Sequence, residues 1–163
     1  MTIEIQKGYW PGCIGRITEV HASYYSHLVG FGLAFEAKVA REMAEFCSRY
    51  EEGRDGLWLA RNSDGGIHGS IAIDGVHAKE MGAHLRWFIT DGQARGTGLG
   101  NMLLTSAIEF CRQCGYSRVY LWTFDGLDAA RHLYEKFGFQ LVQQHRGSQW
   151  GVEVEEQCFE LRP

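Results

Sequence analysis

An apolar strand that runs directly into a glycine-rich turn and a helix is the feature that most constrains this chain. Residues 83–90, AHLRWFIT, have the aromatic and branched side chains of a strand, and DGQARGTGLG follows at 91–100. Glycine costs a helix about 0.5–1 kcal/mol relative to alanine, so three alternating glycines at a helix start need a reason. Unpaired amide N–H groups and the helix dipole make such a turn an anion site. The stretch therefore predicts an α/β protein with a phosphate-binding turn.

Helices and strands are predicted to alternate along the rest of the chain, as in an α/β domain. Residues 13–20 are predicted as the first strand, 21–28 as a short helix and 29–35 as a loop. Apolar side chains at helical spacing predict a stronger helix from about 35 to 50. The other predicted elements are a hairpin of 56–61 and 67–74, a helix from 99 to about 115, a strand at 118–124, a helix within 128–139, and strands at about 140–145 and 152–161.

Composition indicates one globular domain and argues against several classes of function. The chain has 163 residues, of which 45% are hydrophobic and 13% aromatic. No run approaches the roughly 20 apolar residues that cross a bilayer, and no signal-peptide pattern is visible, so we expect no membrane partner and a cytoplasmic protein. A net charge of −4 without a basic stripe argues against a nucleic-acid partner. The five cysteines lack zinc-like spacing, so we expect reduced thiols and no metal.

Three phosphate-binding motifs compete for the glycine-rich turn. A P-loop requires Lys and Ser or Thr after its last glycine, but Asn101 and Met102 follow Gly100. The glycines at 96, 98 and 100 also depart from the GxGxxG spacing of dinucleotide-binding proteins. The pattern that remains is Q-x-x-G-x-G at residues 93–98.

This pattern resembles the pyrophosphate motif of the GNAT (GCN5-related) N-acetyltransferases, [Q/R]-x-x-G-x-[G/A]. AARHLYEKFGF at 129–139 is similar to the second signature of that family, A-x-x-L-Y-x-x-x-G-F, and follows in the right order. The resemblance covers about residues 8–161 and implies a single acetyltransferase domain over 1–163. The implied GNAT fold is a mixed α/β (α+β) sheet of six to seven strands. About four helices would cover its two faces, and strands 4 and 5 would splay in a V.

Within the family, three stretches resemble the acetyltransferase half of proteins that fuse a MarR-type regulator to a GNAT domain: GYWPGCIGRI, HLRWFI and VYLWTFDGLDAARHLYE. The chain has no room for the DNA-binding half, so we expect a free-standing relative, with a homodimer as one assembly to consider. Two functions compete. One is an acetyl-CoA-dependent N-acetyltransferase that moves the acetyl group to a primary amine of a small molecule or protein by direct attack. The other is a non-catalytic acyl-CoA sensor or interaction module.

The resemblance also implies how acetyl-CoA is held. Backbone amides of strand 4 would bind the pantetheine arm in the gap between the splayed strands, and amides of the glycine-rich turn would bind the diphosphate. The residues carried over for cofactor binding are Phe88, Ile89, Gln93, Arg95, Gly96, Thr97, Gly98, Leu99 and Gly100. Leu127 stands where many members of the family have an asparagine that contacts the cofactor, so one polar contact is missing.

Two side chains are implied in catalysis, because the amine must lose a proton and the leaving thiolate can need one. Tyr134 matches the family tyrosine near the thioester sulfur, where it would protonate the thiolate, position the sulfur or only pack on its helix. His84 stands where many members have a glutamate base, and its reference pKa of about 6.5 suits proton abstraction. Strand alternation predicts His84, Arg86 and Phe88 on one face. A structural role for His84, Glu80 as the base and a chain of waters are alternatives.

The acceptor site of the family is walled by the loop between the first two helices, which corresponds to residues 26–36. Glu36 would anchor a cationic amine there, and the acidic surplus of the chain favours such an acceptor. The aromatic residues of this region can equally be core residues. The acceptor-site residues that the resemblance implies are Tyr25, Phe31, Phe35 and Glu36, with Tyr24, Trp122 and Trp150 as further aromatic candidates.

Overall fold

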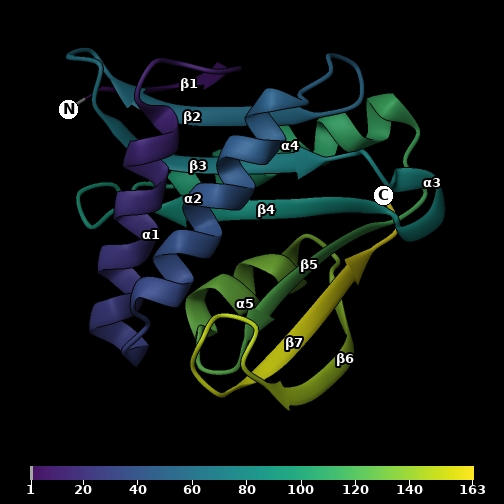
Figure 1. The fold of residues 1–163 in the computed structure, drawn as a ribbon. Coiled ribbons are helices and arrows are strands. Elements are labelled where there is room, and N and C mark those ends of the chain that lie inside the picture. Colours follow the sequence, from purple (N-terminus) through teal and green to yellow (C-terminus); the bar gives the residue numbers. More distant parts are fainter. Residues whose placement is uncertain (1) are drawn as a thin grey trace.

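A seven-stranded mixed sheet organises the computed structural model, which describes residues 2–163 (Figure 1). Its strands are β1 (Ile3–Lys7), β2 (Gly56–Asn62), β3 (Ile67–Asp74), β4 (Ala83–Thr90), β5 (Val119–Phe124), β6 (Gln140–Gly147) and β7 (Val154–Leu161). They lie in the order β1-β2-β3-β4-β5-β7-β6. Among the described strands β4 and β5 pair in parallel, and the other neighbours are antiparallel. The predicted mixed α/β class and strand number are confirmed.

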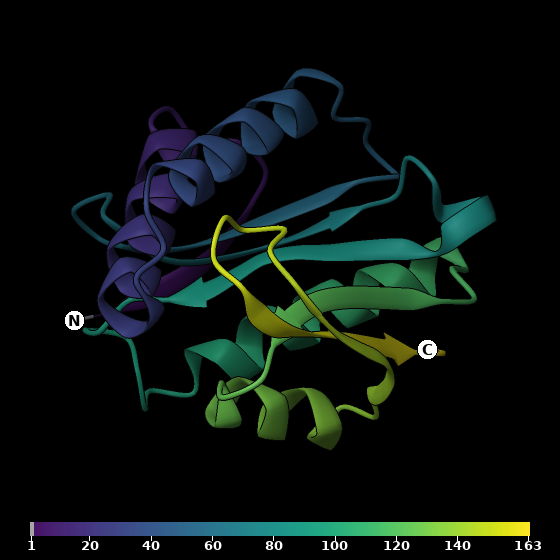
Figure 2. The same cartoon turned by 60° about the horizontal axis from the view of Figure 1, so that its bottom comes forward.

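Four long helices cover the two faces of the sheet (Figure 2). Helices α1 (Cys13–Val29) and α2 (Leu33–Ser48) lie on one face, and α4 (Leu99–Cys114) and α5 (Asp128–Lys136) lie on the other. The short helix α3 (Ala78–Met81) precedes β4. Each face has its own hydrophobic cluster: Phe46 and Met43 of α2 are fully buried in one, and Leu103 and Leu104 of α4 in the other. The predicted helices at 35–50, at 99–115 and within 128–139 and the predicted strands from residue 56 onward are confirmed within a few residues.

The prediction of a first strand at 13–20 is wrong, because these residues form the first half of α1. The branched side chains of this stretch favour a strand locally. However, Cys13, Ile17, Val20 and His21 are buried at helical spacing, so packing against the sheet decides the structure. The first strand is β1, which pairs antiparallel with β2 and to which the sequence reading assigned no element.

A β-bulge interrupts β4 halfway along its length. The β3–β4 register shifts between Ser70 and Ala72, and Trp87 of β4 has a left-handed φ of 49°. The Ser70 hydroxyl donates a hydrogen bond of 2.7 Å to the Trp87 carbonyl oxygen, which satisfies a backbone acceptor at the irregular position. A bulge of this kind adds one residue to a strand and changes the direction of the side chains that follow.

The bulge overturns the predicted facing of β4. Trp87 packs in the cluster under α1 and α2, whereas both Leu85 and Phe88 pack in the cluster under α4 and α5. Arg86 pairs with a carboxylate of α2, so Arg86 and Phe88 point to opposite faces. The prediction that His84, Arg86 and Phe88 share one face is therefore wrong for Phe88. The extra residue depends on the pairing with β3 and cannot be found from the period of β4 alone.

Candidate active site

The parallel strands β4 and β5 separate shortly after they begin. Only two pairs of residues are in register, Ala83 with Val119 and His84 with Tyr120. Beyond these pairs the strands diverge, as Figure 1 shows. This confirms the predicted splay between strands 4 and 5. A cavity of about 180 Å³ lies between them and is lined by residues 85–88 of β4, residues 121–124 of β5 and side chains of α1, α2 and α5.

The glycine-rich turn at 91–98 joins β4 to α4 and leaves a set of amides unpaired. Gly96 and Gly98 have φ values of 76° and 81°, a left-handed conformation that glycine adopts without strain. Gly98 is the N-cap of α4. Within residues 2–163, no backbone or side-chain acceptor receives the N–H groups of residues 95, 96 and 98–101. These amides at a helix N-terminus form a ready site for an anion.

Asp91 holds the turn in this conformation. Its Oδ1 accepts hydrogen bonds from the amides of Gln93 at 3.0 Å and Ala94 at 3.1 Å. Its Oδ2 lies 2.7 Å from His68 Nδ1 of β3 and 3.2 Å from an Arg16 nitrogen of α1. The sequence reading missed Asp91, although an aspartate that caps amides two and three residues ahead is a recognised turn pattern.

The side chains of the turn differ in exposure. Those of Gln93, Arg95 and Thr97 are exposed, whereas Leu99 is buried under α4. Arg95 lies over the ring of Tyr24, with its guanidinium carbon 4.3 Å from the ring centre. The turn therefore offers an anion mainly backbone amides, with one flexible cation beside them.

Among residues 2–163, the edge of β4 that faces β5 has no strand partner after His84, so backbone groups there are open to an extended ligand. Ile89 is buried and pairs with Ser70 on the opposite edge. The Phe88 ring lies 5.9 Å from that of Tyr134. Gly100, at the start of α4, brings its backbone close to the Phe88 and Leu133 side chains.

Tyr134 of α5 lines the cavity and is 6% exposed. Its ring packs against Phe88, Phe139 and Phe159, and no described residue bonds to its hydroxyl. Burial, followed by the nearby Tyr25 hydroxyl, raises the pKa of Tyr134 well above its usual value. Tyr134 is therefore a protonated donor at any ordinary pH.

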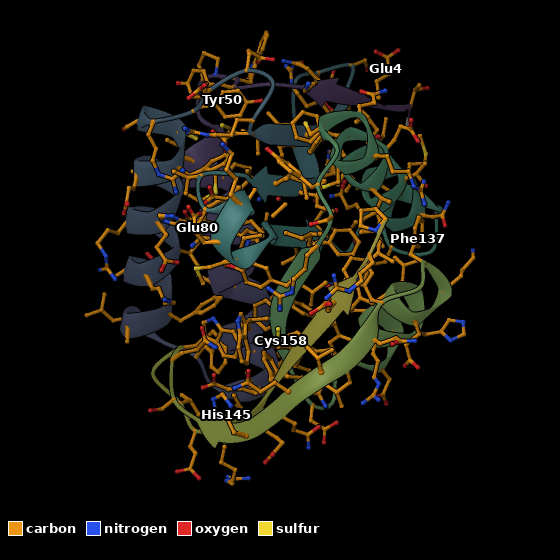
Figure 3. All side chains as sticks on the ribbon, turned by 90° about the vertical axis from the view of Figure 1, so that its right-hand side faces the viewer. Glu4, Tyr50, Glu80, Phe137, His145 and Cys158 are labelled. Atoms are coloured by element: carbon orange, nitrogen blue, oxygen red, sulfur yellow. The ribbon has the colours of Figure 1, made fainter. Side chains whose placement is uncertain are left out.

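His84 lies where β4 and β5 separate, with its ring stacked on that of Tyr120 at a centroid distance of 4.5 Å. Burial, followed by the nearby charge of Arg86, lowers the pKa of His84 to about 3. The imidazole is therefore neutral at pH 7. Glu80, the alternative base, lies on α3 and is exposed, and it lines no described cavity (Figure 3).

A cluster of aromatic residues forms part of the cavity wall. Tyr25 of α1, Phe31 and Phe35 pack with Phe124 of β5 and Trp150, and neighbouring ring centres lie 4.9–6.2 Å apart. All five of these residues line the cavity, as does Trp122. They are thus core and cavity wall at once. Burial raises the pKa of Tyr25 far above its usual value.

Glu36 is exposed on α2 and does not line the cavity. The charged residues that do line it were missed by the sequence reading: Lys38 and Glu42 of α2 and Arg86 of β4. Glu42 accepts from Lys38 at 2.8 Å and from Arg86 at 2.7 Å. The lysine–glutamate pair at i and i+4 was the available sequence signal, but such pairs are common on exposed helices.

Residues 2–163 contain no group of three or more His, Cys, Asp or Glu side chains placed to hold a metal ion. All five cysteines are free thiols. No helix in the described part of the chain is long and apolar enough to cross a membrane.

The chain belongs to the acetyltransferase (GNAT) family, whose family model matches residues 16–139. This membership makes it an acyltransferase. An uncharacterised N-acetyltransferase of Schizosaccharomyces pombe is 28% identical over 119 residues, which are 73% of this chain and 72% of that protein. Human N-acetyltransferase 8B is 29% identical over 90 residues, which are 54% of this chain but only 40% of the human protein.

Solved structures share the whole fold at low sequence identity. A GNAT acetyltransferase of Staphylococcus aureus superposes with a TM-score of 0.79 at 20% identity, covering 99% of each chain. A putative acetyltransferase of Salmonella typhimurium, yncA, solved with its cofactor acetyl-CoA, has a TM-score of 0.76 at 16% identity and covers 99% of this chain and 94% of its own. This likeness establishes the GNAT fold.

Proposed function

We propose that the protein is an acetyl-CoA-dependent N-acetyltransferase that acts on a primary amine by direct attack. The observation that carries the proposal is the unpartnered amides of residues 95, 96 and 98–101, at the end of a strand that splays from its parallel neighbour. These amides would bind the diphosphate, and Phe88 and Ile89 of β4 would hold the pantetheine arm. Acetyl-CoA in the structure of the similar Salmonella protein supports acetyl-CoA as the ligand.

In the reaction, the amine nitrogen attacks the thioester carbonyl carbon, and the carbon–sulfur bond breaks. The nitrogen loses a proton, and the departing thiolate gains one. Tyr134 supports the second transfer, because its hydroxyl lines the cavity and stays protonated. Since a thiol has a reference pKa near 8.5, a tyrosine with a raised pKa gives up its proton only as the bond breaks or acts by positioning the sulfur.

His84 is proposed to accept a hydrogen bond from the attacking amine or from a water molecule. Its low pKa argues against stable proton storage, because the imidazolium form is disfavoured until about pH 3. We infer that the proton passes on to water, and that His84 orients the donor. Tyr25, Phe31 and Phe35 would form the apolar wall beside the acceptor. The exposed position of Glu36 gives it no part in this proposal.

A second candidate is an acyl-CoA sensor without turnover, in keeping with the resemblance to MarR–GNAT fusion proteins. The observation in its favour is Leu127, which is the N-cap of α5 and offers no polar group at that position. The five free thiols support a reducing compartment such as the cytoplasm for either function.

The two functions are separated by one experiment. The protein is incubated with acetyl-CoA and a broad panel of amines, thiol release is followed with DTNB, and CoA binding is measured by calorimetry. Amine-dependent thiol release supports the transferase. CoA binding without release over the whole panel would favour the sensor, and absence of CoA binding would contradict both.

A further inference from the structure

Two cations and a single carboxylate face the acceptor end of the cavity. Lys38 and Arg86 supply the positive charges and Glu42 the negative charge. Two histidines also line the cavity, but burial lowers the pKa of His21 to about 4 and of His84 to about 3, so both are neutral at pH 7. The wall therefore carries a net charge of about +1, in contrast to the acidic chain as a whole.

Two acids contact these cations, and each of the two acids bonds to two positively charged side chains. Glu42 bonds to both Lys38 and Arg86, at 2.8 and 2.7 Å. Arg86 also bonds to Asp74 at 3.1 Å, and Asp74 in turn receives two hydrogen bonds from Arg49, at 3.0 and 2.8 Å. Arg49 also has Glu45 and Asp55 near it. The positive balance is therefore that of the cavity wall itself, where Lys38 and Arg86 face Glu42 alone.

Lys38 and Arg86 each have N–H donors that no described contact uses. A lysine ammonium has three N–H donors and an arginine guanidinium has five. The described contacts of Lys38 use one, and those of Arg86 use two. The Arg86 guanidinium is held in place by two carboxylates and by the Trp87 ring, 4.2 Å from its centre. An ordered guanidinium with spare donors is well suited to bind a carboxylate.

The described cavity wall has no free carboxylate that could anchor a cationic acceptor. Glu42, its one carboxylate, is already bound by two cations. Positive charge beside the site also disfavours an ammonium ion and favours the neutral amine that attacks the thioester. The same field lowers the pKa of His84, to which Arg86 and Lys38 both contribute.

We propose that the acceptor is an amino acid or similar small molecule that carries a carboxylate, which Lys38 and Arg86 bind while its amine reaches the thioester. This inference rests on the proposed function and replaces the cationic acceptor that the sequence suggested. It makes Lys38 and Arg86 specificity-determining residues.

The test compares matched acceptors, each as the free amino acid, its carboxamide and its decarboxylated amine, with aliphatic, aromatic and polar side chains represented. Binding to the CoA-saturated protein is measured by calorimetry over a range of pH, so that the different amine pKa values do not decide the comparison. We expect some free acid to bind about tenfold or more tightly than its amide. Equal or weaker binding of every acid would overturn the inference.

Two substitutions sharpen the test. Lys38→Met is expected to weaken binding of the acid about tenfold and to leave binding of the amide and of CoA unchanged. Lys79→Met, at an exposed lysine of α3 that does not line the cavity, is the matched control. Glu42→Gln removes the carboxylate that Lys38 and Arg86 share and leaves Arg86 paired with Asp74 only, so the acid should bind at least as tightly as in the wild type. If Glu42→Gln loses acceptor binding while Lys38→Met binds the acceptor as the wild type does, Glu42 is instead an anchor for a cation.

Binding and turnover answer different questions in this design. Thiol release tests the acetyltransferase, and the acid-to-amide binding ratio tests the carboxylate. Rapid turnover of amides and simple amines, without an advantage for acids, would refute the carboxylate and leave the transferase standing. Preferential binding of acids without thiol release would refute the transferase and leave the carboxylate site standing.

Discussion

The two ends of the proposed site are built in different ways. The proposed diphosphate end is one continuous turn, residues 91–98, which lies outside the cavity lining and whose glycines and backbone amides would supply the binding groups. The acceptor end is assembled from side chains of α1, α2, β4, β5 and the segment between β6 and β7. The first end is therefore local in sequence and insensitive to most side chains, whereas the second depends on long-range packing. A family can keep the first and change its acceptor through the second.

The largest effect is expected at Gly98. Gly98→Val should raise the Kd for CoA about a hundredfold, because a branched residue resists the left-handed φ of 81° and the amides then turn away. Calorimetry with CoA measures the effect. Gly115→Val, at the C-cap of the same helix with a φ of 73°, introduces similar strain far from the turn and should leave the Kd unchanged. Equal CoA affinity in Gly98→Val and the wild type would place the diphosphate elsewhere.

The next largest effect is expected at Tyr134, where the thioester would lie between the two ends. Tyr134→Phe removes one hydroxyl from the cavity and should lower kcat roughly thirtyfold with little change in KM for acetyl-CoA. Because the pKa of Tyr134 is raised, wild-type kcat should not decline at alkaline pH through this group. Tyr9→Phe, at an exposed tyrosine, serves as the control. An unchanged kcat would reduce Tyr134 to a packing role.

A smaller effect is expected at the support of the turn. Asp91→Ala removes the acceptor for the Gln93 and Ala94 amides and the partner of His68, so the turn loosens. We expect the KM for acetyl-CoA to rise about tenfold with kcat nearly unchanged. Asp64→Ala, in the exposed β2–β3 turn, is the control. A fall in kcat with unchanged KM would show that Asp91 acts on the chemistry and not on the turn.

The smallest effect concerns stability and pH at the acceptor end. The folded protein holds the pKa of His84 at about 3, against 6.5 in the unfolded chain. Below about pH 6.5 the unfolded state therefore binds a proton that the folded state does not, and the free energy of unfolding decreases as pH falls toward 3. His84→Phe keeps a ring to stack on Tyr120. It should reduce the slope of the free energy of unfolding against pH by the equivalent of at most about one bound proton. His132→Phe, at an exposed histidine of α5, is the matched control, and denaturant titrations at several pH values measure the slope in both variants.

The same contrast explains what the sequence could predict. The glycine turn, the flanking strand and helix and the position of Tyr134 follow from local patterns, and the family comparison agrees with them. The helix at 13–20 was predicted as a strand because its branched residues outweigh a helical burial pattern that only the packed sheet reveals. The facing of Phe88 depends on a bulge opposite Ile71, which no property of β4 alone indicates. The cluster of Lys38, Glu42 and Arg86 joins a helix to a strand more than forty residues away.

The central claim is that backbone amides of the turn at 91–98 and the start of α4 bind the diphosphate of coenzyme A. A crystal structure of the protein with CoA tests it most directly. We expect diphosphate oxygens within hydrogen-bonding distance of the Gly96, Gly98 and Gly100 amides, and the CoA sulfur beside Tyr134 in the gap between β4 and β5. A diphosphate bound at any other place, with these amides facing solvent, would contradict it.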